Sequence, residues 1–253
     1  LTLGDDNVGN LIVEKLSQEN VDMTFAIQQP STSSNYSTVI NYSGERTIFT
    51  YHAPRSYEFP VALPVTPWAY LTSMGESFRP FYNHFIEWIK KNPSVKLAFN
   101  PGTWQLKAGV EGMGDVLALT YLLFVNRQEA EKLSGLENSQ GKEKELLAAV
   151  SKLGPKLVVI TDGANGSFIS DGQKTVKAGV LPVDAYERTG AGDAFGSGAL
   201  AALIKGKSLE EALIWGTLNS ASVIGFVGPQ RGLIREAEMQ EWLERYKSSG
   251  VKV

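Results

Sequence analysis

Hydrophobic and polar residues alternate in two neighbouring segments, residues 36–42 and 47–51. This alternation is typical of half-buried β-strands, and both segments are rich in the β-branched and aromatic residues that strands favour. Ser43-Gly44 lies between them and predicts the turn. We therefore predict a β-hairpin here, a small antiparallel sheet that stands apart from the main domain.

The segment before the hairpin predicts one helix. Apolar residues at helical spacing predict a helix over residues 8–18, and Asp5 or Asp6 can cap its start. Residues 1–6 are interpreted as a loop that enters this helix. A chain that starts in such a loop, without Met, suggests that further residues precede it.

From Trp68 onward, strand and helix patterns alternate. Continuous apolar strands, such as residues 157–160, indicate a parallel sheet covered by helices on both faces. Gly112 and Gly114 predict a break within one of the helices. The predicted strands are residues 69–73, 95–99, 121–125 and 156–161, and the predicted helices are residues 81–91, 104–119, 126–133 and 142–153.

The C-terminal third predicts a second hairpin followed by three helices. Residues 167–170 and 174–178 surround a turn at Asp171-Gly172, and Ser208 with Glu211 has the spacing of a capping box. The predicted helices are residues 191–205, 209–225 and 236–247.

Composition narrows the class of protein. The chain has 253 residues, 43% hydrophobic and 20% charged, with a formal net charge of −3, no cysteine and two histidines. Disulfides and thiolate metal sites are excluded, and a histidine zinc site is not expected. With no basic run, no apolar run of membrane length and no secretory signal pattern, we expect a cytoplasmic enzyme without nucleic acid or membrane partners.

The most informative stretch is residues 189–193, a small-residue turn that runs directly into a helix. Free N–H groups at a helix start attract an anion, and glycine lets phosphate oxygens approach the backbone. Asp193 would lie beside that anion and could accept a proton from a hydroxyl group. The alternative is an ordinary helix cap. A dinucleotide fingerprint is excluded by Phe195, and a Walker loop by Ala201, because each replaces a required glycine.

Several other candidates have a structural alternative that the residues alone leave open. Asn126 and Glu129 could form a capping box, residues 161–166 could be only a tight turn, and Asn219 could be a polar helix residue. The hairpin aromatics could pack rather than contact a substrate; they are Tyr36, Tyr42, Phe49 and Tyr51.

Together these segments resemble the ribokinase-like (PfkB) carbohydrate kinases. Residues 189–193 look like the family's second signature, Asn126 to Glu129 like its NxxE element, and residues 161–166 like its TxGxxG nucleotide loop. Asn219 resembles an asparagine near adenine, and residues 3–9 resemble the family's GDDxxG segment. All five occur in family order and cover nearly the whole chain.

The resemblance implies the fold. It is an α/β class fold, a ribokinase-like three-layer αβα sandwich with a mostly parallel central sheet and a small β lid. Residues 1–253 would form one such domain, incomplete at its N-terminus, with residues 28–60 contributing the lid. Family members begin with a strand and a glycine-rich segment upstream of the GDD element, so we expect about fifty or more preceding residues (a buried gap in a sheet leaves backbone groups unpaired).

The resemblance also implies the chemistry. Asp193 would be the catalytic base, and the N–H groups of Gly190, Ala191 and Gly192 would stabilise the transferring phosphoryl group. Glu129 and Asn126 would organise Mg²⁺, largely through water. The other residues expected to bind the nucleotide are Thr161, Gly163, Gly166, Thr189 and Asn219.

One departure concerns a monovalent cation. The family has Asp-Thr before the position of Thr189 and often binds K⁺ there, whereas this chain has Glu187-Arg188. The longer Glu187 could still serve, so K⁺ dependence stays open. Arg188 could assist ATP or point to solvent.

Three functions remain in view: a sugar or sugar-acid kinase, a nucleoside kinase of the same fold, and a non-catalytic nucleotide-binding relative. Arg55 could bind a substrate carboxylate or be solvated. The intact turn around Asp193 argues against the non-catalytic relative. Free edges of the hairpin invite pairing, so we expect a homodimer through the lid.

Overall fold

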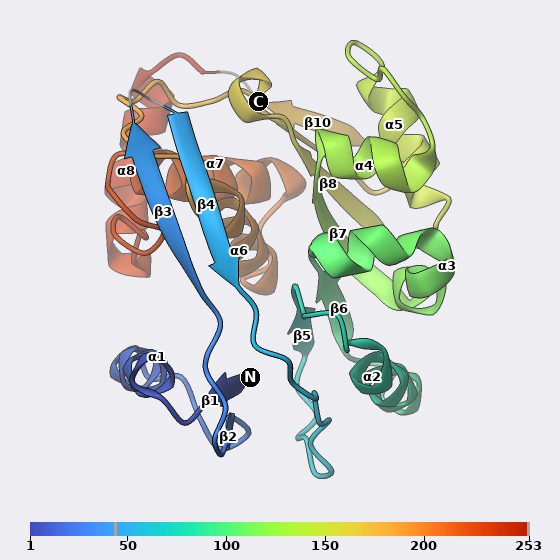
Figure 1. Ribbon diagram of the computed structural model, residues 1–253. Coiled ribbons are helices and arrows are strands. Elements are labelled where there is room, and N and C mark those ends of the chain that lie inside the picture. Colours follow the sequence, from blue (N-terminus) through green and yellow to red (C-terminus); the bar gives the residue numbers. More distant parts are fainter. Residues whose placement is uncertain (43–44, 252–253) are drawn as a thin grey trace. The chain divides into compact units, whose positions relative to one another are not determined.

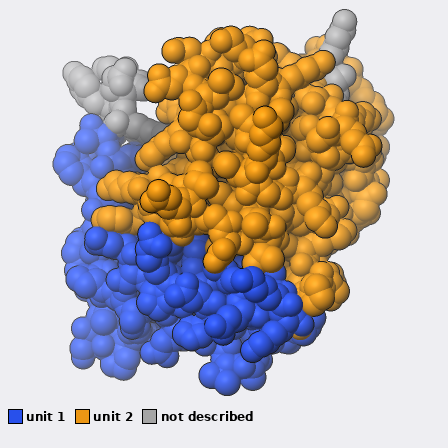
Figure 2. Space-filling view, turned by 90° about the vertical axis from the view of Figure 1, so that its right-hand side faces the viewer, with its two compact units in different colours: residues 1–65, 74–91 blue, residues 66–73, 92–253 orange. Residues whose placement is uncertain are grey.

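The computed structural model describes residues 1–42 and 45–251 (Figure 1). The predicted turn at Ser43-Gly44 lies outside the described residues. Chain contacts divide the molecule into two compact units, coloured in Figure 2. The first comprises residues 1–65 and 74–91, and the second comprises residues 66–73 and 92–253. The prediction of a single domain with a lid at residues 28–60 stays a prediction.

The first unit opens with β1 (Thr2–Gly4), which pairs in parallel with β2 (Ile27–Gln29). The sequence predicted a loop over residues 1–6, but they contain a strand that only long-range pairing creates, because three residues carry too little local pattern. Strand β2 begins only at Ile27, because the residues before it turn, with the Ala26 N–H bonded to the Met23 carbonyl at 2.9 Å.

Helix α1 (Asn7–Gln18) confirms the predicted helix, and Asp6 is its cap. The Asp6 carboxylate accepts from the Gly9 N–H and from the Ser34 N–H, both at 2.8 Å. These hydrogen bonds lower the pKa of Asp6. The GDD segment therefore fixes the start of α1 against the chain that leads into the hairpin.

The hairpin is confirmed as β3 (Tyr36–Tyr42) and β4 (Glu45–Tyr51), antiparallel, with Tyr36 opposite Tyr51. Because side chains alternate along a strand, one face carries several large apolar groups. These are Tyr36, Ile40, Phe49 and Tyr51, all between 44% and 59% exposed. The same unit ends in α2 (Arg79–Lys91), whose Phe81 and Phe85 contact Phe59.

The second unit is built on a six-stranded sheet of order β10-β9-β8-β7-β6-β5. The neighbours β5 to β8 are parallel, and β9 and β10 continue the sheet antiparallel. The strands are β5 (Trp68–Leu71), β6 (Lys96–Phe99), β7 (Thr120–Asn126), β8 (Leu157–Thr161), β9 (Ser167–Ser170) and β10 (Thr175–Ala178). The predicted strands and second hairpin are confirmed to within a few residues.

Helices cover both faces of this sheet (Figure 1). On one side lie α3 (Thr103–Leu119), α4 (Arg127–Ser134) and α5 (Glu143–Ser151), and on the other α6 (Ala191–Ile204) and α7 (Leu209–Val223). Helix α8 (Met239–Ser248) follows a short 3₁₀ turn at Glu236–Glu238, so the helix predicted at 236–247 starts as 3₁₀. The layers confirm the three-layer α/β expectation.

The break in α3 occurs at Gly109, not at Gly112 or Gly114 as the sequence suggested. Gly109 has φ of 66° and ψ of −169°, a conformation that side chains disfavour. The other two glycines remain helical, which glycine tolerates at a modest cost in stability. Composition alone does not reveal which glycine in a cluster adopts the left-handed backbone.

Candidate active site

Two of the predicted elements leave the sheet side by side. Asn126, the last residue of β7, lies in register opposite Thr161, the last residue of β8. In open α/β sheets, ligands bind at the carboxyl ends of the parallel strands. The NxxE element and the 161–166 loop therefore begin next to each other, at the edge where a site is expected.

The start of α4 is a complete capping box. Asn126 accepts from the Glu129 N–H through Oδ1, and its own N–H donates to Glu129 Oε2, both at 2.9 Å. Burial raises the pKa of Glu129, although these bonds with Asn126 act in the opposite direction. Asn126 and Glu129 thus form the capping box that was the alternative to a binding role. To bind Mg²⁺ as well, they would have to use atoms other than those in the two capping hydrogen bonds.

The 161–166 loop closes on itself. The Asp162 N–H donates to the Gly166 carbonyl at 2.8 Å, and the Asn165 N–H to the Asp162 carbonyl at 2.9 Å. Gly166 has φ of 93°, and a Cβ there would lie 2.1 Å from the Ala178 carbonyl oxygen. Only glycine fits this position, so the loop's conformation is fixed both by its own hydrogen bonds and by its close approach to Ala178.

Helix α6 starts without a side-chain cap. Its N-cap is Gly190, with φ of 79° and ψ of 0°, and a Cβ there would lie 2.5 Å from the Pro229 Cβ. The first N–H groups of a helix have no intrahelical partner and carry the positive end of the dipole. That of Ala191 donates to the Arg188 carbonyl at 3.3 Å. The helix-start donors of Gly192 and Asp193 have no intrahelical partner, so they are available to an acceptor such as an anion.

Asp193 is the third residue of α6; the residue as a whole is exposed, while its carboxyl group is partly buried. In residues 1–42 and 45–251, no hydrogen bond to its carboxylate is found. Burial of the carboxyl group raises the pKa of Asp193. A carboxylate that reaches solvent, lacks a protein partner and is partly desolvated has the properties of a general base.

The sheet lies directly beneath this turn. At Gly196, one helical turn after Asp193, a Cβ would lie 3.3 Å from the Tyr70 hydroxyl and 3.8 Å from the Phe124 ring. Burial raises the pKa of Tyr70 to about 12, and the negative charge of Asp193 contributes to the rise. The sequence pattern marked Tyr70 only as part of a strand, and nothing local to β5 identifies it as a neighbour of Asp193.

Glu187 ties two loops beside the turn. Its Oε1 accepts from Thr189 Oγ1 at 2.6 Å and its Oε2 from the Gly228 N–H at 2.8 Å. Thr189, expected to contact the nucleotide, thus bonds to Glu187 here. Arg188 is exposed beside this turn, and whether it assists ATP stays open.

Asn219 is buried in α7, and its amide binds protein on both sides. It donates to the Ala194 carbonyl at 2.7 Å and accepts from the Ile234 N–H at 2.9 Å. It therefore supports the first turn of α6.

Arg55 in the first unit also binds within the protein, donating to the carbonyls of Thr2 and Ser33, each at 2.6 Å. These bonds differ from both alternatives considered for Arg55.

Asn126 and Thr161 thus end adjacent strands of the second unit, and α6 packs at Gly196 against Tyr70 and Phe124 of the same sheet. Within residues 1–42 and 45–251, no group of three acidic or histidine side chains is arranged to bind a metal directly. In the same residues, no helix is long and apolar enough to cross a membrane.

A sequence profile described as pfkB family carbohydrate kinase matches residues 1–235. The chain belongs to this family. It is 27% identical over 239 residues to the ATP-dependent 6-phosphofructokinase of Thermoanaerobacterium thermosaccharolyticum, covering 90% of this chain and 73% of that protein. It is 27% identical to the ribokinase of Haemophilus influenzae over 253 residues, covering 96% and 79%. This pfkB-family chain is an ATP-dependent phosphotransferase.

Solved structures confirm the ribokinase fold. A putative ribokinase II of E. coli superposes with a TM-score of 0.81 at 19% identity, covering 96% of this chain and 82% of that one. Arabidopsis thaliana ribokinase, solved with ribose and ATP, has a TM-score of 0.78 at 20% identity, covering 96% and 80%. The E. coli protein has also been solved with ATP and Mg²⁺, with a TM-score of 0.76 at 19% identity, covering 96% and 82%.

Proposed function

We propose that this kinase transfers the γ-phosphoryl group of ATP to a hydroxyl group of a sugar or sugar acid, with Asp193 as the general base. One observation carries the proposal. Asp193 stands on a helix start that lacks a side-chain cap, its carboxylate has no hydrogen-bond partner in the described residues, and burial raises its pKa. Family membership supplies the reaction class.

In this mechanism the Asp193 carboxylate removes the proton of the acceptor hydroxyl. The hydroxyl oxygen forms a bond to the γ-phosphorus, while the bond from that phosphorus to the bridging oxygen breaks and ADP leaves. The N–H groups at the start of α6, from the turn that Gly190 opens, stabilise charge on the transferring group. The proton on Asp193 then passes to solvent, which restores the base.

The described residues fit a Mg²⁺ ion that keeps most of its water. Mg²⁺ retains several waters and often uses few protein ligands. Asn126 and Glu129 would hold it through water, with Oε2 of Glu129 already used in the cap. Bound there, the ion would neutralise phosphate charge. Thr161, Gly163 and Gly166 would shape the loop beside the phosphates.

Asn219 is proposed to act near the nucleotide through the backbone it supports, since its amide already binds Ala194 and Ile234.

Dependence of the activity on K⁺ is proposed to be weak, because both oxygens of Glu187 accept protein hydrogen bonds. ADP release in KCl and in NaCl should then be similar. Strong activation by KCl would contradict this proposal.

A nucleoside kinase is the second candidate, and the exposed hairpin aromatics favour it. Tyr36, Phe49 and Tyr51 stand on one face of the hairpin, where an aromatic side chain could stack on a base. Relatives include a nucleoside kinase of Methanocaldococcus jannaschii, 28% identical over 152 residues, covering 60% of this chain and 48% of that protein. The hairpin would then act as a lid.

The same exposed face favours a homodimer formed through the hairpin. We also propose that the enzyme acts in the cytoplasm, with ATP as its co-substrate. Phe49→Ser should shift the protein toward monomer in sedimentation velocity at matched concentration. An unchanged distribution, or a monomeric wild type, would contradict the dimer.

The test of function is product formation. The protein is incubated with Mg-ATP and, in separate reactions, ribose, fructose, 2-keto-3-deoxygluconate, adenosine and other nucleosides. ADP is quantified and the phosphorylated acceptor is identified by mass spectrometry. Phosphorylation of a sugar or sugar acid supports the first candidate, and phosphorylation of a nucleoside the second. Mg-ATP binding without turnover on any acceptor would favour a non-catalytic relative.

A further inference from the structure

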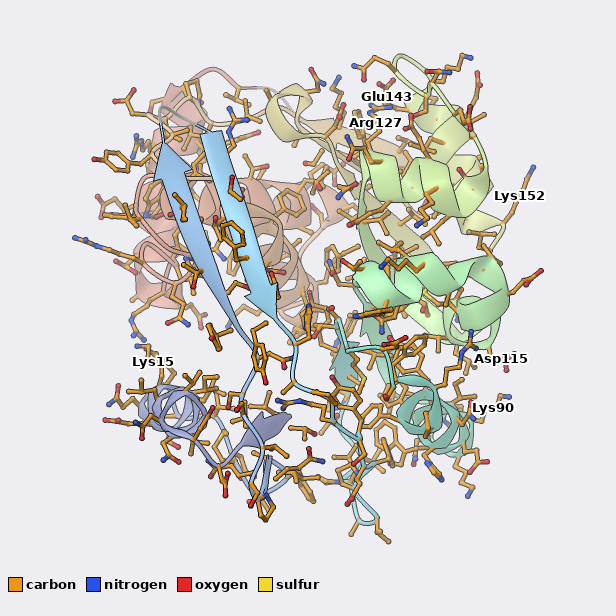
Figure 3. All side chains as sticks on the ribbon, viewed as in Figure 1. Lys15, Lys90, Asp115, Arg127, Glu143 and Lys152 are labelled. Atoms are coloured by element: carbon orange, nitrogen blue, oxygen red, sulfur yellow. The ribbon has the colours of Figure 1, made fainter. Side chains whose placement is uncertain are left out.

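Arg127 is a buried cation inside the NxxE element, at a position that the signature leaves unspecified. It is 8% exposed and is the first residue of α4, directly after Asn126. Its guanidinium donates from Nη1 to the Ser139 carbonyl at 2.9 Å and from Nη2 to Glu143 Oε1 at 2.9 Å. Figure 3 shows Arg127 and Glu143 meeting where α4 and α5 begin.

The same guanidinium reaches the neighbouring loop. Its Nη2 lies 2.9 Å from Oδ2 of Asp162 and forms an ion pair with it. It also stacks on the Phe168 ring, with 5.7 Å from the guanidinium carbon to the ring centre. Asp162 is the second residue of the 161–166 loop and Phe168 is the second residue after it. One side chain therefore holds the loop at its entry and at its exit.

The charges explain why a cation is required. Asp162 and Glu143 place two carboxylates behind elements that would meet the phosphates of ATP, and the side chains of both are less than a quarter exposed. A buried carboxylate without a partner is strongly unfavourable, and removal of one member of a buried pair leaves the other uncompensated. Arg127 forms ion pairs with both carboxylates and so neutralises them.

We propose that Arg127 is a positioning residue that, through Asp162 and Phe168, holds the 161–166 loop beside the start of α4 in the geometry that binds Mg-ATP. The proposal rests on the proposed function and deepens it. It assigns a role to two residues, Arg127 and Asp162, that the motifs leave free. It predicts effects on nucleotide affinity and little effect on the acceptor.

The test uses three variants: Arg127→Met, Asp162→Asn and the double variant that carries both changes. A fourth variant, Lys174→Met, is the control. Lys174 forms an exposed ion pair with Glu210 and serves as the control for loss of a cation. Mg-ATP affinity is measured by calorimetry, KM for the acceptor by ADP release, and loop opening by amide hydrogen exchange over residues 162–166. Melting temperature is recorded for every variant.

We expect Arg127→Met to weaken Mg-ATP binding by about ten-fold or more, and Asp162→Asn by less, on the scale of directly coupled residues. The double variant should be no weaker than Arg127→Met alone, because both changes remove one interaction. Exchange over residues 162–166 should be faster in these variants. In all these variants the KM for the acceptor should stay within about two-fold of wild type. In Lys174→Met the Mg-ATP affinity and the exchange rate over residues 162–166 should also stay within about two-fold of wild type.

A lower melting temperature with unchanged Mg-ATP affinity and unchanged loop exchange would overturn the proposal, since Arg127 would then act on stability alone. If Arg127→Met does not fold, Asp162→Asn decides, because it keeps Arg127 paired with Glu143. A wild type that phosphorylates no acceptor contradicts the proposed function instead, and loop exchange and Mg-ATP affinity still test the role of Arg127.

Discussion

The helices α4 and α7 begin in one way and α6 begins in another, although all three carry an acid at the third helical position. In α4, Asn126 and Glu129 cap each other, and in α7 Ser208 and Glu211 do the same, with Glu211 accepting from the Ser208 N–H at 2.9 Å. In α6 the cap is Gly190, which has no side chain, and Asp193 has no partner for a reciprocal bond.

This difference separates stability from function. A capping box satisfies helix-start donors and typically stabilises a helix by about 1 kcal/mol. Helix α6 gives up that stabilisation and leaves its donors and its acid available to a ligand. Departures from local stability rules concentrate at functional sites, and α6 is such a departure. The predictions below test whether the uncapped start is the catalytic one.

The largest effect is expected for Asp193→Asn, which keeps the shape of the side chain and removes the base. The rate constant kcat should fall by about 10²- to 10⁴-fold, the usual contribution of a general base, with Mg-ATP affinity retained. Glu211→Gln makes the same chemical change at the start of α7 and should leave kcat unchanged. Comparable losses in both variants would show that the two helix starts do not differ in function.

Gly190→Ala is expected to reduce kcat by about 10²-fold, the scale of a lost backbone donor in a charge-stabilising site. The alanine Cβ would meet Pro229 and disfavour the positive φ, so the turn must move. Gly172→Ala provides the control, because Gly172 also has positive φ, 85°, but nothing lies within 4 Å of its Cβ. It should cost stability without lowering kcat.

Glu129→Gln separates the cap of α4 from the role proposed for Mg²⁺. Glutamine keeps both hydrogen bonds of a capping box, so the free energy of unfolding should change little. The Mg²⁺ concentration needed for half-maximal rate should rise by about ten-fold, as when supporting groups of a metal are removed. An unchanged Mg²⁺ requirement in this variant would assign Glu129 to the cap alone.

The smallest effect concerns stability and pH. Because burial raises the pKa of Asp193 in the folded protein, ionisation of its carboxyl group opposes folding. Its favourable contribution is present below the unfolded pKa and is lost as pH rises through the folded pKa. Urea unfolding should therefore show Asp193→Asn gaining stability relative to wild type from low to neutral pH. A difference that is constant with pH would contradict the raised pKa.

Much of the second unit follows from local pattern. The apolar strands β7 and β8, the boxes at Asn126 and Ser208 and the glycine turn before Asp193 each carry their signal within a few neighbouring residues. The parallel sheet and its helical layers follow from alternation of strands and helices. The candidate site was accessible because its signature residues lie in short segments with recognisable spacing.

Other features depend on residues far apart in the chain. Strand β1 exists only because it pairs with β2, and Tyr70 comes near Asp193 only because β5 and α6 pack together. Arg127 and Asp162 are separated by α4, α5 and β8, and the motifs that contain them do not specify either residue. Such contacts arise from the tertiary fold, so periodicity and spacing do not encode them.

The central claim is tested most directly by the pH dependence of kcat at saturating Mg-ATP and acceptor, in wild type and in Glu129→Gln. Burial raises the pKa of both Asp193 and Glu129, so either carboxyl group could control the rate. The Glu129→Gln variant removes the Glu129 carboxyl group and leaves that of Asp193. The account predicts that kcat rises with pH through an ionisation above the ordinary aspartate value of about 3.9, in both proteins. A rate that is flat with pH in wild type, or an acid limb that disappears in Glu129→Gln, would contradict Asp193 as the base.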